Sequence, residues 1–265
     1  MSDHRPIGVF DSGVGGLTVV SQMQKILQEE DIVYFGDTAR VPYGTKSKET
    51  VTKFSVENVE FLMEKNVKLV VVACNTASSL ALEFLKRCFR VPIIGVIAPG
   101  AKGAVHSTRN NRVGVIGTSA TVASGAYERA IKKINPRIAV FPRSCPLFVP
   151  LVEEGWLNKQ VTRDIALEYL APFRAKKVDT LILGCTHYPL LRKVIQDIVG
   201  SSVLLVDSAK EVAKEARVIL DSSGLLNRRG RAGKHSFFVS DEPGRFVKTA
   251  ERFLRKRITC AKRAV

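Results

Sequence analysis

The chain reads Val70-Val-Val-Ala-Cys74-Asn-Thr76 and, 111 residues further on, Leu181-Ile-Leu-Gly-Cys185-Thr-His187. In both stretches a short apolar run ends in a small residue, a cysteine and side chains that can form hydrogen bonds. An earlier pair, Gly8-Val-Phe-Asp-Ser12 and Gly114-Val-Ile-Gly-Thr118, is similar at an offset of 106 residues. The two pairs indicate a weak internal repeat of two α/β units. Two such units facing each other would bring Cys74 and Cys185 to one cleft from opposite sides.

The apolar runs predict a parallel sheet in each unit. Eight runs are apolar throughout rather than alternating, as strands covered on both faces are. Helical patterns lie between them, one of them with Ser47 as its expected N-cap, and this alternation is typical of an α/β fold. The expected strands are Ile7–Phe10, Ile32–Phe35, Leu69–Ala73, Ile93–Ile97, Val113–Ile116, Ile138–Phe141, Thr180–Leu183 and Val203–Val206.

The region after residue 206 is expected to return to the first unit. It contains a helical pattern from Ser208 to about Leu220, a strand pattern at Ser236–Ser240 and a final helix. We therefore expect a first lobe made of residues 1–96 and 207–265 and a second lobe made of residues 97–206.

Composition limits the class of protein. The 265 residues are 45% hydrophobic and 25% charged, which is typical of a globular chain. The longest apolar run, Val91–Ala101, has 11 residues, far below the ~20 of a membrane-spanning helix. The start, Met-Ser-Asp-His-Arg-Pro, has no apolar core, so no secretory signal is expected. Five cysteines, an odd number, favour a reduced, cytoplasmic protein.

The net charge of +16 is concentrated near the C-terminus. Residues 228–265 hold twelve Lys or Arg and three acids, which gives +9. A basic patch is the usual footprint of a nucleic-acid contact, but no helix-turn-helix, zinc-finger or RNP pattern accompanies this one. A solvated basic segment is the favoured interpretation, and a non-specific nucleic-acid contact is the alternative.

Two glycine-containing loops follow expected strands. Asp11-Ser-Gly-Val-Gly-Gly16 could offer backbone N–H groups to a small anion such as a carboxylate, with Asp11 for an ammonium group, or could simply be a tight turn. It fits neither nucleotide-binding motif. In the loop Gly36–Gly44, Tyr43 and the N–H of Gly44 could close over a ligand, or the segment could be a surface loop.

Cys74 and Cys185 are the candidate reactive groups. Ligands of open α/β sheets bind outside the carboxyl ends of the strands, where both cysteines are expected, and a helix N-terminus lowers the pKa of a thiol. His187 could be a structural histidine or a base beside the thiol. A metal site would lack a fourth ligand. Cys88, Cys145 and Cys260 are interpreted as small structural residues.

Five motifs in order resemble those of bacterial glutamate racemase, of the aspartate/glutamate racemase family, over nearly the whole chain. Aspartate racemases typically carry Glu where this chain has His187, and the first turn is also of the glutamate type. The five motifs are D-S-G-V-G-G-L at 11–17, F-G-D-T at 35–38, P-Y-G at 42–44, C-N-T-A-S at 74–78 and G-C-T-H-Y-P-L-L at 184–191.

The resemblance implies two pseudosymmetric α/β lobes with the active site in the cleft between them, and interconversion of L- and D-glutamate for peptidoglycan synthesis. It implies no cofactor and no metal, a cytoplasmic location and a homodimer. Cys74 and Cys185 match the two proton donor/acceptors, supported by Asp11, Glu153 and His187. The implied substrate contacts are Asp11, Ser12, Tyr43, Gly44, Asn75, Thr76, Thr118, Thr121, Thr186 and His187.

Chemistry agrees with this assignment. Inversion by proton transfer needs a base and an acid on opposite faces of Cα, and two thiols about 7 Å apart across the substrate could exchange these roles. Neutral donors from Asn75, Thr76 and Thr186 would stabilise the carbanion. The alternatives are racemisation of a related acid, such as aspartate or a hydantoin, by the same thiols, or a nucleic-acid or partner-binding protein that uses the basic segment.

Overall fold

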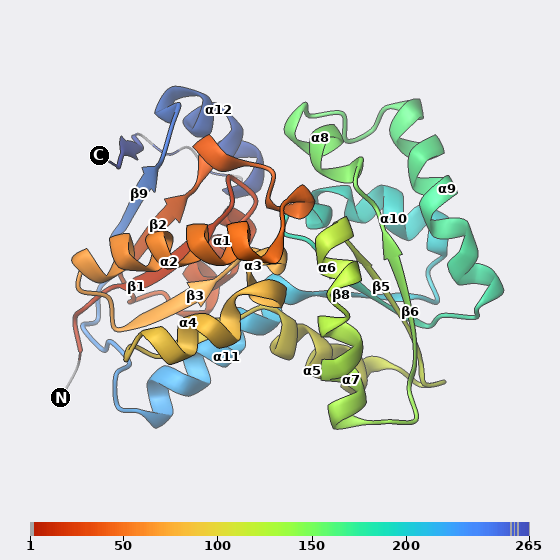
Figure 1. The fold of residues 1–265 in the computed structure, drawn as a ribbon, viewed down its shortest axis with the longest axis horizontal. Coiled ribbons are helices and arrows are strands. Elements are labelled where there is room, and N and C mark those ends of the chain that lie inside the picture. The colour runs from red at the N-terminus through yellow and green to blue at the C-terminus, as the bar shows by residue number, and fades with distance from the viewer. Residues whose placement is uncertain (1–2, 255, 257, 259, 265) are drawn as a thin grey trace.

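The computed structural model describes residues 3–254, 256, 258 and 260–264, and it contains two parallel sheets side by side (Figure 1). The first sheet has the order β10-β9-β2-β1-β3-β4 and the second β6-β5-β7-β8. The two-lobed α/β fold expected from the sequence is confirmed. The strands of the first sheet are β1 (Ile7–Asp11), β2 (Ile32–Gly36), β3 (Leu69–Val72), β4 (Ile93–Gly95), β9 (His235–Val239) and β10 (Lys262–Arg263); those of the second are β5 (Arg112–Gly117), β6 (Ala139–Ser144), β7 (Thr180–Gly184) and β8 (Leu204–Asp207).

Helices surround each sheet (Figure 1). Around the first lie α1 (Leu17–Ile26), α2 (Lys48–Glu64), α3 (Asn75–Leu80), α4 (Leu82–Cys88), α11 (Ser208–Ser222) and α12 (Pro243–Leu254), with the short 3₁₀ helices η1 (Thr38–Arg40) and η2 (Tyr43–Thr45). Around the second lie α5 (Ile97–Ser107), α6 (Ser119–Ala123), α7 (Ala126–Ile134), α8 (Phe148–Glu153), α9 (Gln160–Ala175), η3 (Tyr188–Leu191) and α10 (Arg192–Val199).

The strand predictions agree with the structure to within one residue at each end, except at two strands, and β10 was not predicted. The strand expected at Ile138–Phe141 is β6, which runs on to Ser144 because its pairing with β5 continues to Gly117. The expected strand Ile93–Ile97 ends at Gly95, because Ile97 already begins α5. The final helix expected after β9 ends at Leu254, and the two-residue strand β10 follows it in parallel with β9. Ser47 caps α2 as expected, since its side chain accepts a hydrogen bond from Thr50 N. The lobe boundaries at residues 96/97 and 206/207 remain a proposal.

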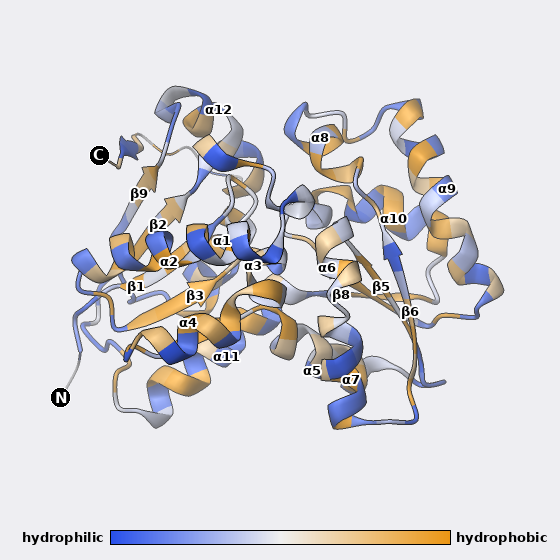
Figure 2. Ribbon diagram, in the orientation of Figure 1, coloured by the Kyte–Doolittle hydropathy of each residue, from blue (hydrophilic) through white to orange (hydrophobic). Residues whose placement is uncertain are grey.

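Apolar residues fill both faces of the sheets. β3 is buried along its whole length and is strongly hydrophobic, whereas the outer helix α7 shows a hydrophilic face (Figure 2). One apolar core is continuous between the lobes, from Val9 and Leu17 through Val212 to Leu183. Separate cores cover the other face of each sheet. The lobes therefore share buried surface on one side, while the strand ends meet at the cleft.

Strand register sets where the polar side chains of the cleft begin. In the first sheet Asp11 pairs with Gly36, and Phe10 pairs with Val72. In the second sheet Gly117 pairs with Gly184, so Thr118 and Cys185 both follow the same edge. The carboxyl ends of parallel strands thus bring these motifs together, as the sequence predicted.

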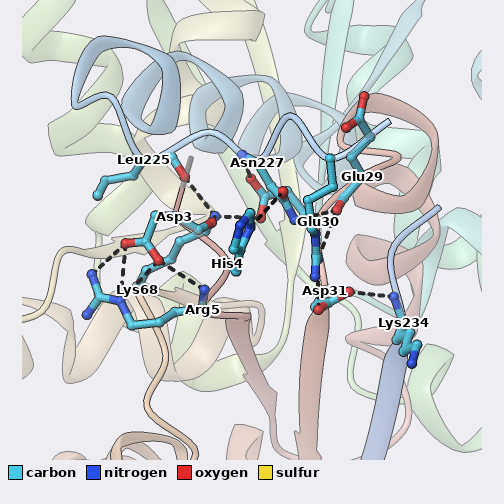
Figure 3. Close-up of polar contacts among 11 residues, drawn as sticks. Asp3, His4, Arg5, Glu29, Glu30, Asp31, Lys68, Leu225, Asn227 and Lys234 are labelled. Carbon is cyan, nitrogen blue, oxygen red and sulfur yellow. Dashed lines mark hydrogen bonds and ion pairs between the residues drawn. The ribbon is translucent and has the colours of Figure 1, made fainter. Parts of the chain in front are cut away.

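The opposite end of the first sheet carries a buried ion pair (Figure 3). Lys68 Nζ lies 2.7 Å from Glu30 Oε2 and donates to the carbonyls of Asp3 and Leu225. The Glu30 carboxylate also accepts a hydrogen bond from Asn227 N. This cluster fastens the N-terminal segment and the chain after α11 to the sheet.

Part of the basic C-terminal segment is paired within the protein. Arg229 has a side chain only 15% exposed and lies 2.8 Å from Asp31 Oδ2, so it is not a free surface charge. Arg228 pairs with Asp221. Among the helices that the structure describes, none has the length and apolar character needed to cross a bilayer.

Candidate active site

A cavity of about 370 Å³ lies between the lobes at the strand ends. It contains both cysteines of the repeated motif, which come from opposite lobes. Eleven of the thirteen site residues expected from the sequence line it, and Asp11 and Thr121 do not. The lining residues are Ser12, Val41, Pro42, Tyr43, Gly44, Thr45, Cys74, Asn75, Thr76, Thr118, Ser119, Pro146, Val149, Pro150, Glu153, Cys185, Thr186 and His187.

Cys74 follows β3 and caps the short helix α3. Its Sγ accepts a hydrogen bond from Ala77 N at 3.5 Å and lies 3.7 Å from Ser12 Oγ. Burial raises the pKa of the Cys74 thiol to about 12, and the nearby Asp11 carboxylate adds to the rise. The Ala77 N–H at the start of α3 lowers this pKa, as expected, but the net shift is upward, so the expected lowering below the ordinary thiol value is wrong for Cys74. Here burial and a negative neighbour outweigh one N–H donor.

Cys185 directly follows β7 in the other lobe and lies beside a histidine–glutamate pair. His187 Nδ1 is 3.9 Å from Cys185 Sγ, and His187 Nε2 is 3.0 Å from Glu153 Oε1. Burial lowers the pKa of His187, but its bonds to Cys185 and Glu153 raise it more, to about 10. Burial raises the pKa of Glu153, but the contacts with His187 and the charge of Arg245 hold it below its ordinary value. An imidazolium beside a thiol favours the thiolate form.

Asp11 lies beneath the cavity rather than on its wall. It is fully buried, its Oδ2 accepts from Gly13 N at 3.0 Å, and Thr186 Oγ1 lies 3.5 Å from its Oδ1. Burial raises the pKa of the Asp11 carboxyl, partly offset by His187 and by the amides of Gly16 and Gly13. Two of the N–H groups expected to bind an anion, those of Gly13 and Gly16, therefore bond to Asp11 instead. A direct contact between Asp11 and substrate stays a prediction.

The glycine turn packs against the second lobe. A Cβ at Gly15 would lie 2.5 Å from His187 Nδ1 and would collide with Thr186 Oγ1. Thr18 Oγ1 also donates to the carbonyl oxygen of Thr186. Gly15 therefore allows close approach of the two lobes. Gly13, Gly15 and Gly16 have no positive φ, so the turn does not depend on backbone angles that only glycine adopts.

The loop around Tyr43 closes one side of the cavity. The Tyr43 hydroxyl donates to Asp37 and accepts from Asn58 Nδ2 at 3.1 Å, so it is already engaged. A Cβ at Gly44 would lie 2.8 Å from Thr118 Cβ, which means that only glycine lets η2 approach α6 this closely.

Hydroxyl groups join the lobes beside Cys74. Thr76 Oγ1 lies 2.9 Å from Thr118 Oγ1 and 3.3 Å from Thr121 Oγ1. Thr118 also caps α6 by accepting from Thr121 N. Thr121 thus lies behind the cavity wall. Its hydroxyl orients Thr76 and Thr118, which line the cavity.

The apolar part of the cavity wall was missed by the sequence reasoning, as were Thr45 and Ser119. The neighbours of Glu153 in Leu147-Phe-Val-Pro-Leu could have indicated it, because Val149 and Pro150 lie one turn or less before that acid. Apolar residues in a helix give no sign of whether they face a core or a ligand. The missed apolar residues are Val41, Pro42, Pro146, Val149 and Pro150.

The remaining cysteines lie outside the cavity. Cys88 and Cys260 are exposed, and Cys145 is buried with a pKa raised by burial to about 12. In the part of the chain that the structure describes, no three His, Cys, Asp or Glu side chains form a group that could hold a metal ion.

Fold and cavity together define an α/β protein of two facing lobes with one thiol from each lobe at a small-molecule cleft. The sequence profile of the Asp/Glu/Hydantoin racemase family matches residues 7–216, and the chain belongs to this family.

Individual relatives match over nearly the full length. The glutamate racemase of Geobacter metallireducens is 54% identical over 250 residues, which cover 94% of this chain and 93% of that protein. The crystal structure of a Bacillus anthracis glutamate racemase superposes with a TM-score of 0.95 at 40% identity, covering 99% and 98% of the two chains. The Francisella tularensis glutamate racemase in complex with D-glutamate gives 0.92 at 41% identity, also covering 99% and 98%.

Proposed function

We propose that this chain is a glutamate racemase that interconverts L- and D-glutamate without an added cofactor. The observation that carries the proposal is that Cys74 and Cys185, from opposite lobes, line the same cavity. The high identity to proteins named glutamate racemase supports glutamate as the substrate. Aspartate or a hydantoin is the alternative, because the family description includes them.

The proposed mechanism uses one thiol on each face of Cα. Cys185, beside the His187 imidazolium, takes the Cα proton of L-glutamate. Cys74, whose pKa of about 12 keeps it protonated at neutral pH, donates a proton to the opposite face and forms D-glutamate. That step leaves Cys74 without its proton and Cys185 protonated, and in this form Cys74 takes the Cα proton of D-glutamate while Cys185 donates one to the opposite face. At a turnover of about 10 s⁻¹, which is typical of enzymes, the activation barrier for this proton transfer would be about 16 kcal/mol.

The wall of the cavity supplies what the carbanion needs. Asn75, Thr76 and Thr186 bring neutral donors to the same space as the thiols. Such donors stabilise charge that develops on the α-carboxylate, and they are most effective where apolar side chains such as Val149 exclude water. Asp11, Glu153 and His187 act on the thiols as tuners in this proposal.

We also propose that the enzyme works in the cytoplasm as a homodimer and supplies D-glutamate for peptidoglycan synthesis. The unpaired cysteines support a reducing compartment. The pairing of Arg228 with Asp221 and of Arg229 with Asp31 reduces the charge available to a nucleic acid, so we do not favour that contact.

The test is racemisation of purified enantiomers by circular dichroism with no cofactor added. We expect L- and D-glutamate each to approach an equal mixture, with aspartate and hydantoins converted far more slowly. Cys74→Ser and Cys185→Ser should each lose at least a hundredfold in rate, because a serine hydroxyl is too weak an acid to exchange protons near neutral pH. Cys88→Ser, at an exposed cysteine outside the cavity, is the matched control.

Two outcomes would overturn the proposal. One is a requirement for added pyridoxal phosphate. The other is a cysteine variant, either Cys74→Ser or Cys185→Ser, that racemises glutamate at the rate of the Cys88→Ser control. A preference for aspartate would retain the mechanism and replace the substrate.

A further inference from the structure

The side-chain amide of Asn75 has a hydrogen-bond partner for its oxygen but none for its nitrogen among the described residues. Asn75 begins α3, is 2% exposed and borders the cavity. Its Oδ1 accepts a hydrogen bond from the Tyr127 hydroxyl at 2.7 Å. Its Nδ2 is buried and has no hydrogen-bond partner among the described residues. A buried donor without a partner costs about 1–3 kcal/mol, a cost that a ligand oxygen would remove.

Tyr127 reaches Asn75 from the other lobe. It lies in the first turn of α7, is 3% exposed and does not line the cavity. Gly100 and Gly184 make room for its ring, since a Cβ at either position would lie within 3.3 Å of ring atoms. With backbone on these two sides, the ring has little freedom to turn its hydroxyl away from Asn75.

The hydroxyl keeps its proton at physiological pH. Burial raises the pKa of Tyr127, and the nearby Cys185 and Asp207 add to the rise against a hydrogen bond from Ser208. The phenol therefore has a proton to donate, and it donates this proton to Asn75 Oδ1 at 2.7 Å. This fixes the polarity of the Tyr127–Asn75 bond and leaves the amide NH₂ for another acceptor.

We propose that Tyr127 is a positioning residue that fixes the orientation of the Asn75 amide, so that Nδ2 rather than Oδ1 meets a carboxylate oxygen of the substrate. The proposal rests on the proposed function, because it assumes an amino acid in this cavity. A reversed amide would place two oxygen acceptors against each other and would leave the carboxylate without that donor. Tyr127 would thus act across the lobes without touching the substrate.

The test is a double-mutant cycle. Tyr127→Phe removes only the hydroxyl, and we expect kcat/KM to fall about tenfold, with kcat affected because the bond strengthens as charge develops. Asn75→Ala should lose about a hundredfold. If Tyr127 acts through Asn75, adding Tyr127→Phe to Asn75→Ala should change kcat/KM by less than twofold.

A matched control separates this role from lost stability. Tyr188→Phe removes another buried hydroxyl, bonded at 2.8 Å to the Cys145 carbonyl and outside the cavity. Both variants should lower Tm by similar amounts, but only Tyr127→Phe should lose activity. The inference is overturned if Tyr127→Phe keeps at least half of the wild-type kcat/KM, or if it lowers kcat/KM equally with and without Asn75.

Binding of D-glutamate by calorimetry tests the inference independently of turnover. Tyr127→Phe should raise Kd about tenfold relative to wild type and to Tyr188→Phe. Weakened binding in a protein that does not racemise glutamate would refute the proposed function and support the positioning role. An unchanged Kd in Tyr127→Phe would contradict the positioning role whether or not the wild type is active.

Discussion

His187 lies between two groups that favour its protonated form. One ring nitrogen lies 3.9 Å from the Cys185 sulfur, and the other lies 3.0 Å from a Glu153 carboxylate oxygen. The Phe253 ring meets the imidazole edge-on at 5.4 Å between centroids. The positive charge of His187 beside Cys185 therefore lies among contacts from both lobes.

We expect His187 to remain protonated at pH 8, because its pKa is raised to about 10. Its contribution to stability should be fully present below the ordinary histidine pKa of about 6.5 and should be lost as the pH rises toward 10. Nuclear magnetic resonance of the His187 ring nitrogens measures this directly. A His187 ring that titrates near pH 6.5 would contradict the assignment.

Gly15→Ala should reduce racemisation at least a hundredfold. The added methyl group would collide with Thr186 and His187, so either the turn or these side chains must move. We also expect a loss of about 1–3 kcal/mol in the free energy of unfolding, as for other overpacked sites. The control is Gly244→Ala in α12, where a Cβ has nothing within 4 Å. Equal activity of the two variants would show that the close approach is unnecessary.

At the scale of elements, the C-terminal helix of the first lobe supports an acid of the second. Arg252 in α12 donates to the backbone carbonyl of Glu153 at 2.9 Å, where α8 ends. Arg252 also occupies the space beside Gly155, whose φ of +73° turns the chain after α8. Figure 1 shows α12 and α8 on the same side of the molecule in neighbouring lobes. The helix thus limits where the Glu153 backbone can lie.

Arg252→Ala should lower kcat about three- to tenfold, since Glu153 would hold His187 less firmly. Steady-state kinetics in both directions measures the effect, and we expect the larger loss in the direction that begins at Cys185. Lys248→Ala, an exposed residue of the same helix, is the control. A loss of the same size in both variants would point to a general effect on α12 instead.

The sequence predicted elements better than it predicted the contacts between them. Uniformly apolar runs such as Leu69–Val72 indicate buried parallel strands because both faces are covered. An amphipathic helix such as α12 indicates only that one face is buried, not that Arg252 reaches Glu153 in another lobe. β10 has two exposed residues and therefore no apolar pattern from which it could be predicted.

In the molecule as a whole, a buried ion pair that stabilises the fold and the cavity that holds the two thiols lie at opposite ends of the strands of the first sheet. Lys68 and Glu30 precede β3 and β2 and are both 1% exposed, whereas the cavity lies beyond the ends of those strands. Their ion pair joins segments that are far apart in sequence (Figure 3). Removal of one member of a buried pair leaves an uncompensated charge, which is why such pairs are costly to break.

Lys68→Met should lower the free energy of unfolding by about 3–5 kcal/mol, and replacing Glu30 by Leu in the same protein should restore much of the loss. Urea unfolding measures both changes. The folded protein should keep the wild-type kcat, because the pair is distant from the cavity. Lys53→Met on exposed α2 surface is the control. An unfolding midpoint equal to that of the control would contradict a structural role for the pair.

Much of the candidate site could also be read from the chain, because strand ends in two similar lobes must meet at one cleft. Cys74, Cys185 and their polar neighbours were placed there by that argument, and the cavity contains them. The prediction that failed concerned the pKa of Cys74, which depends on local electrostatic contacts. The raised pKa of Cys74 depends on burial and on Asp11, whose own amide partners come from the glycine turn, and none of these contacts leaves a pattern in the sequence.

The central claim, that two thiols act on opposite faces of Cα, is tested most directly by racemising L-glutamate in D₂O and following Cα deuterium in both enantiomers at early times. A thiol at Cys74 that has exchanged with solvent delivers deuterium to the product. The two-thiol mechanism therefore predicts D-glutamate fully deuterated from the first turnovers, with much less label in the remaining L-glutamate. Product that keeps the original proton, or L-glutamate that is labelled as fast as D-glutamate forms, would contradict it.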